Sequence, residues 1–235
     1  MRGSAALVPA LAIAAQSAPA LSSVPWVRRT LTPRLAGISR SVHLALTYDD
    51  GPDPVSTPHF LDLLEHHRRS ATFFLLGEHA AAYPDLVRHM TRLGHEVAVH
   101  GWDHRCLAAK RPGRLLDELK RTRGLLEDIT GAAVRWYRPP YGVVTSEGLL
   151  AARAAGLQTV LWTAWGRDWT ASATPQSIRR TVLRSLKPGG TVLLHDTDRT
   201  SAPLSWQNTL RASSDLLDDW TRQEVPLGSL SEHWA

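Results

Sequence analysis

The alternation of short strand-like runs with helical stretches, from residue 42 onward, limits what this chain can fold into more than any other feature. Such alternation is typical of βα units wound around a parallel sheet. It predicts an α/β fold, a distorted (β/α) barrel of about seven parallel strands, with an open doubly wound sheet as the alternative. The expected strands lie at about 42–48, 71–76, 95–100, 134–137, 157–162, 191–195 and 224–229.

The segments between the expected strands carry recognisable helix ends. Pro84 lies in the first turn of one helical segment, and Thr174-Pro175 opens another. Residues 112–130 repeat leucine at helical spacing and stop at Gly131. A chain of 235 residues with 43% hydrophobic content is long enough to bury one core of this kind and requires no second domain.

Residues 1–40 differ from the rest, and we treat them as a segment separate from the domain at 41–235. A leading arginine, the apolar run 5–15 and the small residues at 18–20 follow the order of a secretory signal peptide, with a docked N-terminal arm as the alternative. The run is shorter than the roughly 18 residues of a spanning helix, so any membrane association would involve residues 1–27 alone. The signal interpretation predicts an extracellular or cell-envelope protein, whereas arginines downstream of the run favour the cytoplasmic alternative.

Charge and cysteine content bear on the partners and the redox chemistry of the chain. The net charge of +5 favours anionic surfaces, but the arginines are scattered without a dense basic tract, so we expect no nucleic-acid partner. The single Cys106 excludes an internal disulfide and leaves the compartment open. We expect a monomer.

Polar residues follow the ends of the expected strands. In parallel α/β folds the loops converge at the C-terminal ends of the strands, and chemistry collects there. We therefore expect these side chains to meet at one end of the domain. They are Asp49 and Asp50 after the first strand, His100 after the third, Arg138 after the fourth, Asp168 beyond the fifth and His195 after the sixth.

Three of the polar side chains have the chemistry of a metal site. Asp50, His100 and His104 combine two imidazoles with one carboxylate, a mixture that binds a divalent transition metal and leaves positions open for water and substrate. Gly101 favours a tight turn between the histidines over a regular helix. Neighbouring side chains of a strand point to opposite faces, so two adjacent aspartates can share a site only where the strand stops, and Gly51-Pro52 predicts such a stop.

Five motifs, taken in order, give a specific resemblance. They are Thr47-Tyr48-Asp49-Asp50-Gly51, His100-Gly101-Trp102-Asp103-His104, Arg138-Pro139-Pro140-Tyr141, Asp168-Trp169 and Leu193-Leu194-His195-Asp196. Over about residues 42–230 the chain resembles the polysaccharide deacetylase family, carbohydrate esterase family 4, also called the NodB homology domain. The resemblance implies a metal-dependent hydrolase that removes N-acetyl or O-acetyl groups from sugars on a distorted β/α barrel, with residues 41–235 as the catalytic domain.

The resemblance also implies a role for each matching residue. The metal ligands would be Asp50, His100 and His104. The catalytic group would comprise Asp49 as the base, His195 as the acid, Arg138 orienting the base and Asp168 tuning the acid. The substrate would contact Pro140, Tyr141, Trp165 and Trp169, and the backbone N–H of Tyr141 would help to stabilise the oxyanion. This division suits amide hydrolysis, because a metal activates water and an amine leaves only when an acid protonates it.

Two positions depart from the family pattern. Gly101 stands where the family usually has serine or threonine, so a hydroxyl that would help to hold the turn between the histidines is missing. Trp165 stands where the fourth motif usually begins with aspartate. It would either enlarge an aromatic floor for a sugar or pack in the barrel.

The implied cofactor is one divalent metal ion. Zinc is the expected ion, with cobalt, nickel and iron as alternatives, because an aspartate and two histidines suit all of them. The expected substrate is an acetylated aminosugar polymer or oligomer of the chitin or peptidoglycan type. The alternatives are a metal-dependent amide or imide hydrolase or O-acetyl esterase acting on a smaller substrate, and a non-catalytic carbohydrate-binding relative.

Overall fold

The computed structural model, which describes residues 29–106 and 113–235, is built on one parallel sheet. Seven strands follow the order β5-β4-β3-β2-β1-β7-β6, and β8 pairs with the start of β1. The sheet curls into a half-barrel whose open edges are β5 and β6, so the predicted distorted barrel of about seven parallel strands is confirmed. The strands are β1 (Leu44–Asp49), β2 (Thr72–Leu75), β3 (Glu96–Val99), β4 (Trp136–Tyr137), β5 (Gln158–Thr159), β6 (Ala164–Trp165), β7 (Thr191–His195) and β8 (Leu227–Gly228).

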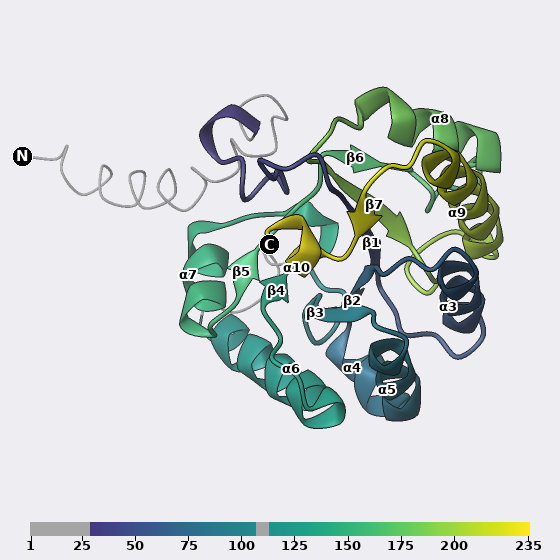
Figure 1. Ribbon diagram of the computed structural model, residues 1–235. Coiled ribbons are helices and arrows are strands. Elements are labelled where there is room, and N and C mark those ends of the chain that lie inside the picture. The colour runs from purple at the N-terminus through teal and green to yellow at the C-terminus, as the bar shows by residue number, and fades with distance from the viewer. Residues whose placement is uncertain (1–28, 107–112) are drawn as a thin grey trace, which may run out of the picture.

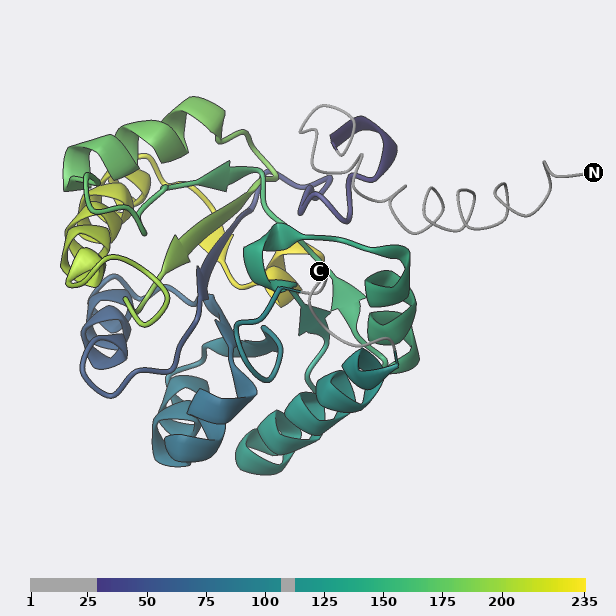
Figure 2. The ribbon, with the colours of Figure 1, turned by 180° about the vertical axis from the view of Figure 1, so that it is seen from behind.

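Helices surround the outer face of the sheet (Figures 1 and 2). Their ends follow local sequence signals: Gly131 ends α6 with a left-handed φ of 68°, and a reciprocal capping box between Thr174 and Ser177 begins α8. The helices are α3 (Thr57–His66), α4 (Gly77–Ala82), α5 (Pro84–Arg92), α6 (Arg114–Thr130), α7 (Ser146–Ala154), α8 (Pro175–Ser185), α9 (Ser205–Arg222) and α10 (Leu230–His233), with a short 3-10 turn, η3, at Pro140–Gly142.

One strand was not expected from the sequence. The predicted strand at 157–162 is the two-residue β5, after which the chain turns and adds β6 beside β7. Both are too short to show a strand period, because a two-residue ladder contains a single alternation. The chain therefore passes from one open edge of the sheet to the other within five residues, from Thr159 to Ala164.

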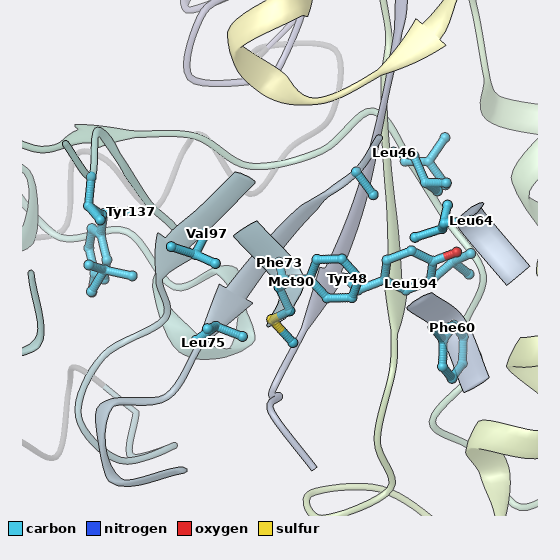
Figure 3. Close-up of a cluster of buried hydrophobic side chains, with 14 of the residues drawn as sticks. Leu46, Tyr48, Phe60, Leu64, Phe73, Leu75, Met90, Val97, Tyr137 and Leu194 are labelled. Atoms are coloured by element: carbon cyan, nitrogen blue, oxygen red, sulfur yellow. The ribbon is translucent and has the colours of Figure 1, made fainter. Parts of the chain in front are cut away.

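Alternate residues of the central strand pack on opposite faces, as strand geometry requires. All six residues of β1 are buried. Leu46 and Tyr48 pack outward with Phe60 of α3 and Phe73 of β2 in the layer between sheet and helices (Figure 3). Ala45 instead belongs to a smaller inner cluster with residues of β2, β3 and β4. The inner face of the sheet is thus apolar near the start of β1 and polar where the strand ends.

The short C-terminal helix α10 closes the apolar end of the half-barrel. Its Leu230 is fully buried in the inner cluster, and the Leu230 N–H donates to the hydroxyl of Thr72 at 2.8 Å. Glu96 accepts from the backbone N–H of Ser231 at 3.2 Å and from the indole N–H of Trp136 at 2.8 Å. Helix α10 therefore covers the end of the half-barrel at which β1 begins, and the polar residues lie at the opposite end, where the strands finish.

The described part of the N-terminal segment lies at the gap between the sheet edges. The carbonyl oxygen of Leu35, in this segment, accepts from the Leu161 N–H at 2.8 Å. The carbonyl oxygen of Gly37 accepts from the Thr191 hydroxyl at 2.7 Å. The apolar run 5–15 lies outside the described residues, so the signal peptide, the docked arm and the cellular location stay predictions. Within residues 29–106 and 113–235, no helix combines the length and the hydrophobicity needed to span a membrane.

Candidate active site

A cavity of about 200 Å³ lies where β1, β3 and β7 end. It brings together the predicted metal ligands with the predicted base and acid, although these residues come from distant parts of the sequence. Its polar lining includes Asp49, Asp50, His100, His104 and His195. Its aromatic lining comprises Tyr141, Trp162, Trp165 and Trp169.

Two adjacent aspartates reach this cavity because the strand ends between them. Asp49 is the last residue of β1, whereas Asp50 has a left-handed φ of 78°, a conformation that costs an ordinary residue about 1–2 kcal/mol. The positive φ thus belongs to Asp50 and not to the glycine that follows it. Gly51 is needed for space, because a Cβ atom there would lie 2.7 Å from Oδ2 of the buried Asp196.

The turn at residues 101–104, which separates the two predicted histidine ligands, is held from both sides. Gly101 has a φ of 105°, and its carbonyl oxygen accepts from the Gly77 N–H at 2.9 Å. The Trp102 N–H donates to Oε1 of Glu118, on α6, at 2.9 Å. The hydroxyl that the family usually supplies at position 101 is therefore absent, but Glu118 and the start of α4 hold the turn in its place.

The three predicted ligands converge on one oxygen atom. Oδ1 of Asp50 lies 3.2 Å from Nε2 of His100 and 3.3 Å from Nε2 of His104. This oxygen is buried and has no hydrogen-bond donor among the described residues. Nδ1 of His100 is 2.9 Å from the carbonyl oxygen of Arg138, which can only accept, so a neutral His100 presents a lone pair at Nε2.

A cation satisfies this arrangement of facing acceptors. The ligand atoms of Asp50, His100 and His104 all lie within 4.8 Å of one another, which is consistent with a divalent metal site. Burial alone would raise the pKa of Asp50, but the neighbouring His100, His195 and His104, when protonated, lower it below its ordinary value. Asp50 is therefore an anion at neutral pH, the form in which a carboxylate binds a metal.

Arg138 fixes the orientation of Asp49 without lining the cavity itself. The guanidinium is completely buried, and its Nη1 donates to Oδ1 of Asp49 at 2.6 Å and to the Thr47 hydroxyl at 2.8 Å. Nη2 donates to the carbonyl oxygen of Leu161 at 3.0 Å. Burial lowers the pKa of Arg138, and the Asp49 carboxylate opposes that change. The arginine thus occupies one Asp49 oxygen and leaves the other free to act.

His195 is held by a carboxylate that is itself fully hydrogen-bonded. Oδ1 of Asp168 lies 3.1 Å from Nδ1 of the His195 ring. Oδ2 accepts from the backbone N–H of His195 at 2.7 Å and from the Thr209 hydroxyl at 3.1 Å. Burial alone would lower the pKa of His195, but Asp168, with smaller contributions from Asp50 and Asp49, raises it to about 10. The imidazole is therefore positively charged at neutral pH, with a proton on each nitrogen. Its Nδ1 contacts Asp168, and its Nε2 points away from Asp168.

Strand register places the predicted base and acid side by side. Asp49 and His195 are paired residues on the adjacent parallel strands β1 and β7. Nε2 of His195 lies 3.9 Å from Oδ2 of Asp50. A proton acceptor and a proton donor thus flank the predicted metal site.

The aromatic lining forms a continuous row. The ring centroids of Trp162 and Trp165 are 5.8 Å apart, and those of Trp165 and Trp169 are 5.1 Å apart. Trp165 is only partly buried and lines the cavity, so it is not simply a core residue. Tyr141 is 65% exposed at the rim. Pro140, also predicted to contact substrate, is buried and is not among the residues that line the cavity.

Several residues of the site were not expected from the sequence. Thr200 and Trp162 line the cavity, and Glu118 supports the histidine turn. Asp196 was seen only as part of a motif, yet its carboxyl is fully buried, accepts from the Thr57 hydroxyl and has a pKa raised to about 7 by burial. Trp162 could have been found from its place at the end of the expected strand 157–162, whereas no sequence signal marks Thr200 or Glu118.

Comparison with known proteins agrees with this geometry. The sequence profile of the polysaccharide deacetylase family matches residues 38–160. A chitooligosaccharide deacetylase from Bradyrhizobium sp. (strain ANU 289) is 39% identical over 205 residues, which cover 83% of this chain and 90% of that protein. A peptidoglycan-N-acetylglucosamine deacetylase from Bacillus cereus is 34% identical over 172 residues, covering 73% of this chain and 62% of that protein.

Comparison with solved structures points to the same family as the sequence comparisons. A solved peptidoglycan N-acetylglucosamine deacetylase superposes with a TM-score of 0.77 at 28% identity, covering 85% of this chain and 91% of that one. Both the profile match and the identity to the Bradyrhizobium protein extend over more than half of the chain. The chain therefore belongs to the polysaccharide deacetylase family, carbohydrate esterase family 4, and is a hydrolase that acts on carbon–nitrogen bonds.

Proposed function

We propose that this protein removes N-acetyl groups from an aminosugar oligomer or polymer of the chitin or peptidoglycan type, with a divalent metal held by Asp50, His100 and His104. The observation that carries the proposal is the buried Oδ1 of Asp50, which faces two imidazole nitrogens and lacks a donor among the described residues. Zinc is the proposed ion, because one carboxylate and two imidazoles leave it open positions for water and substrate.

The residues around the ligands supply the proton transfers. When bound, the metal activates a water molecule and polarises the acetyl carbonyl group. Asp49, whose Oδ1 is occupied by Arg138, has Oδ2 available to accept the proton of the attacking water. His195, protonated and held by Asp168, can donate a proton to the departing amine nitrogen. Base and acid therefore act from neighbouring strands on opposite steps of one hydrolysis.

The cavity has room for only part of a sugar chain. Its volume is about 200 Å³, whereas pockets that enclose a drug-sized ligand measure about 300–1,000 Å³. Such a cavity suits an acetamido group and the ring that carries it, with the remaining sugars outside. The tryptophan row beside the ligands offers apolar surface for those rings. The matched relatives from Bradyrhizobium and Bacillus cereus, which bear the names of sugar deacetylases, support the same substrate class.

An acetate-release assay tests the proposal. Chelator-treated protein would be reloaded with zinc or cobalt and incubated with N-acetylglucosamine oligomers of increasing length, peptidoglycan, O-acetylated xylan and a small cyclic imide. We expect acetate and an equal amount of free amine from the oligomers or peptidoglycan, and none from metal-free protein.

The arms of this assay separate the alternatives. Acetate release from xylan alone would indicate an O-acetyl esterase instead of the proposed N-deacetylase. Turnover of the imide alone would indicate a hydrolase that acts on small molecules. Metal-loaded protein that releases nothing from any acetylated sugar would contradict the proposal.

A further inference from the structure

The loop between β7 and α9, residues 196–204, ties together two parts of the site. The Arg199 Nε–H donates to Oδ2 of Asp53, in the turn after β1, at 2.6 Å. The Ala202 N–H donates to the carbonyl oxygen of Trp169, in the aromatic lining, at 3.0 Å. The short stretch between these two anchors therefore has a fixed position over the cavity.

Thr200 lies between the anchors and contacts a proposed metal ligand. Its hydroxyl donates a hydrogen bond to Oδ2 of Asp50. The neighbouring Ser201 also lines the cavity, but its buried hydroxyl has no hydrogen-bond partner among the described residues. Thr200 thus makes a contact with the site that the adjacent hydroxyl does not make.

The two oxygens of Asp50 consequently have different surroundings. Oδ1 faces Nε2 of His100 and His104 at 3.2 and 3.3 Å, whereas Oδ2 receives the Thr200 hydroxyl and lies 3.9 Å from Nε2 of His195. The terminal torsion of an aspartate side chain is broad, so sterics alone leave the choice of oxygen open. A donor on Oδ2 fixes the carboxylate with Oδ1 toward the histidines.

We infer that Thr200 is a positioning residue that presents a single oxygen of Asp50 to the metal. This role rests on the proposed metal site. One-oxygen binding by Asp50 leaves more of the coordination sphere for water and substrate, as a catalytic site requires. The Thr200 hydroxyl also occupies Oδ2, the Asp50 oxygen nearer to His195, which has to remain available as an acid. Residues that orient a metal ligand typically contribute about 10- to 100-fold to metal affinity or activity.

Metal titration of variants tests this role. Chelator-treated wild type, Thr200→Val, Thr200→Ala, Thr200→Ser and Ser201→Ala would compete for Co²⁺ with a chromophoric chelator, and the visible spectrum of the bound Co²⁺ would be recorded. We expect the valine and alanine variants to lose about tenfold in Co²⁺ affinity and to change the spectrum. Serine should restore both properties, because it keeps the hydroxyl. Ser201→Ala should match wild type in affinity, as a control for changes in the loop itself.

The outcomes distinguish this inference from the function on which it rests. Wild-type protein that binds no Co²⁺ would contradict the metal site and the proposed function together. Wild-type affinity and spectrum in both Thr200→Val and Thr200→Ala would overturn the role of Thr200 alone. A Thr200→Ser variant as weak as the valine variant, or an equal loss in Ser201→Ala, would also overturn it. Using two hydroxyl-free variants of different size guards against a folding defect in one of them.

Discussion

Two carboxylates on opposite sides of the cavity, those of Asp50 and Asp168, differ in whether the protein alone satisfies their oxygens. On the side of β1 and β3, Oδ1 of Asp50 faces two histidine nitrogens and has no donor among the described residues. On the side of β7, the Asp168 carboxylate accepts from the His195 N–H and the Thr209 hydroxyl and also contacts Nδ1 of His195. The Asp50 carboxylate thus has one oxygen without a donor from the described part of the chain, which a cation can contact, whereas the Asp168 carboxylate has its partners as folded.

This difference separates the two tasks of the site. On the side of β1 and β3, here called the cation side, Oδ1 of Asp50 has no hydrogen-bond partner within residues 29–106 and 113–235. An unpaired buried carboxylate oxygen is costly, and a bound cation would remove that cost. On the side of β7, here called the acid side, the protein itself supplies the hydrogen bonds that orient Asp168 and His195. This pair is therefore organised before any ligand binds. Changes on the cation side should therefore alter metal binding, and changes on the acid side should alter the pH dependence of turnover.

The largest effect is expected from Asp49→Asn, which lies on the cation side but is proposed not to bind the metal. Asparagine keeps the shape and can still accept from Arg138, but it cannot take a proton. Turnover should fall by about 10³–10⁴, within the range of general base catalysis, while metal content stays as in wild type. Loss of the bound metal together with activity would show that Asp49 is a ligand.

Stability has to be measured alongside this variant. Removing the Asp49 charge leaves the buried Arg138 without its counter-ion, which costs about 3–5 kcal/mol in comparable sites. Thermal unfolding would establish the folded fraction, and rates would be normalised to it.

A smaller effect is expected on the acid side from Asp168→Asn. The pKa of His195 should fall, because Asp168 is the carboxylate that raises it most. The alkaline limb of the kcat profile, where the acid loses its proton, should then move to lower pH, and turnover at neutral pH should drop by about 10²-fold. Metal affinity should stay unchanged. An unaltered alkaline limb would assign that limb to a group other than His195.

The contact between Asp168 and His195 should also govern part of the pH dependence of the stability of metal-free protein. The pKa of His195 is about 10 in the folded protein against an ordinary value of 6.5, so the folded state binds this proton more tightly. The resulting stabilisation is fully present below pH 6.5 and is lost as the pH rises toward 10. Thermal unfolding of wild type should therefore show a decline over this window that Asp168→Asn lacks. Parallel curves for the two proteins would contradict the coupling.

The smallest effect is expected from Trp165→Leu, in the aromatic row. A single aromatic contact contributes about 0.5–1.5 kcal/mol, so KM for oligomers should rise roughly two- to tenfold while kcat is preserved. KM for the shortest substrate should change least. A fall in kcat without a change in KM would instead place Trp165 in the support of His195 through its contact with Trp169.

Much of the fold and of the site could be predicted from the sequence because the decisive signals are local. The alternation of strands and helices shows in the apolar pattern, and helix ends show in Gly131 and Thr174-Pro175. The residues that carry chemistry fall at strand ends, where the C-terminal edge of a parallel sheet gathers them. The strand β6 escaped because it begins two residues after the expected strand 157–162, with no turn signal between them.

The contacts that complete the site could not be predicted, since they join segments without a shared motif. That Asp49 pairs in register with His195 depends on β7 being the neighbour of β1, which no periodicity specifies. Glu118 reaches the histidine turn from the middle of α6, and Thr200 reaches Asp50 from a loop. Such long-range partners have ordinary sequence surroundings and become visible only in three dimensions.

The most direct test of the central claim is the metal content of wild type and Asp50→Asn after chelation and dialysis against Zn²⁺. Asparagine tolerates the left-handed backbone at position 50, so the variant should remain folded. We expect about one ion per wild-type chain and close to none in the variant. No ion in wild type, or equal occupancy in both proteins, would contradict it.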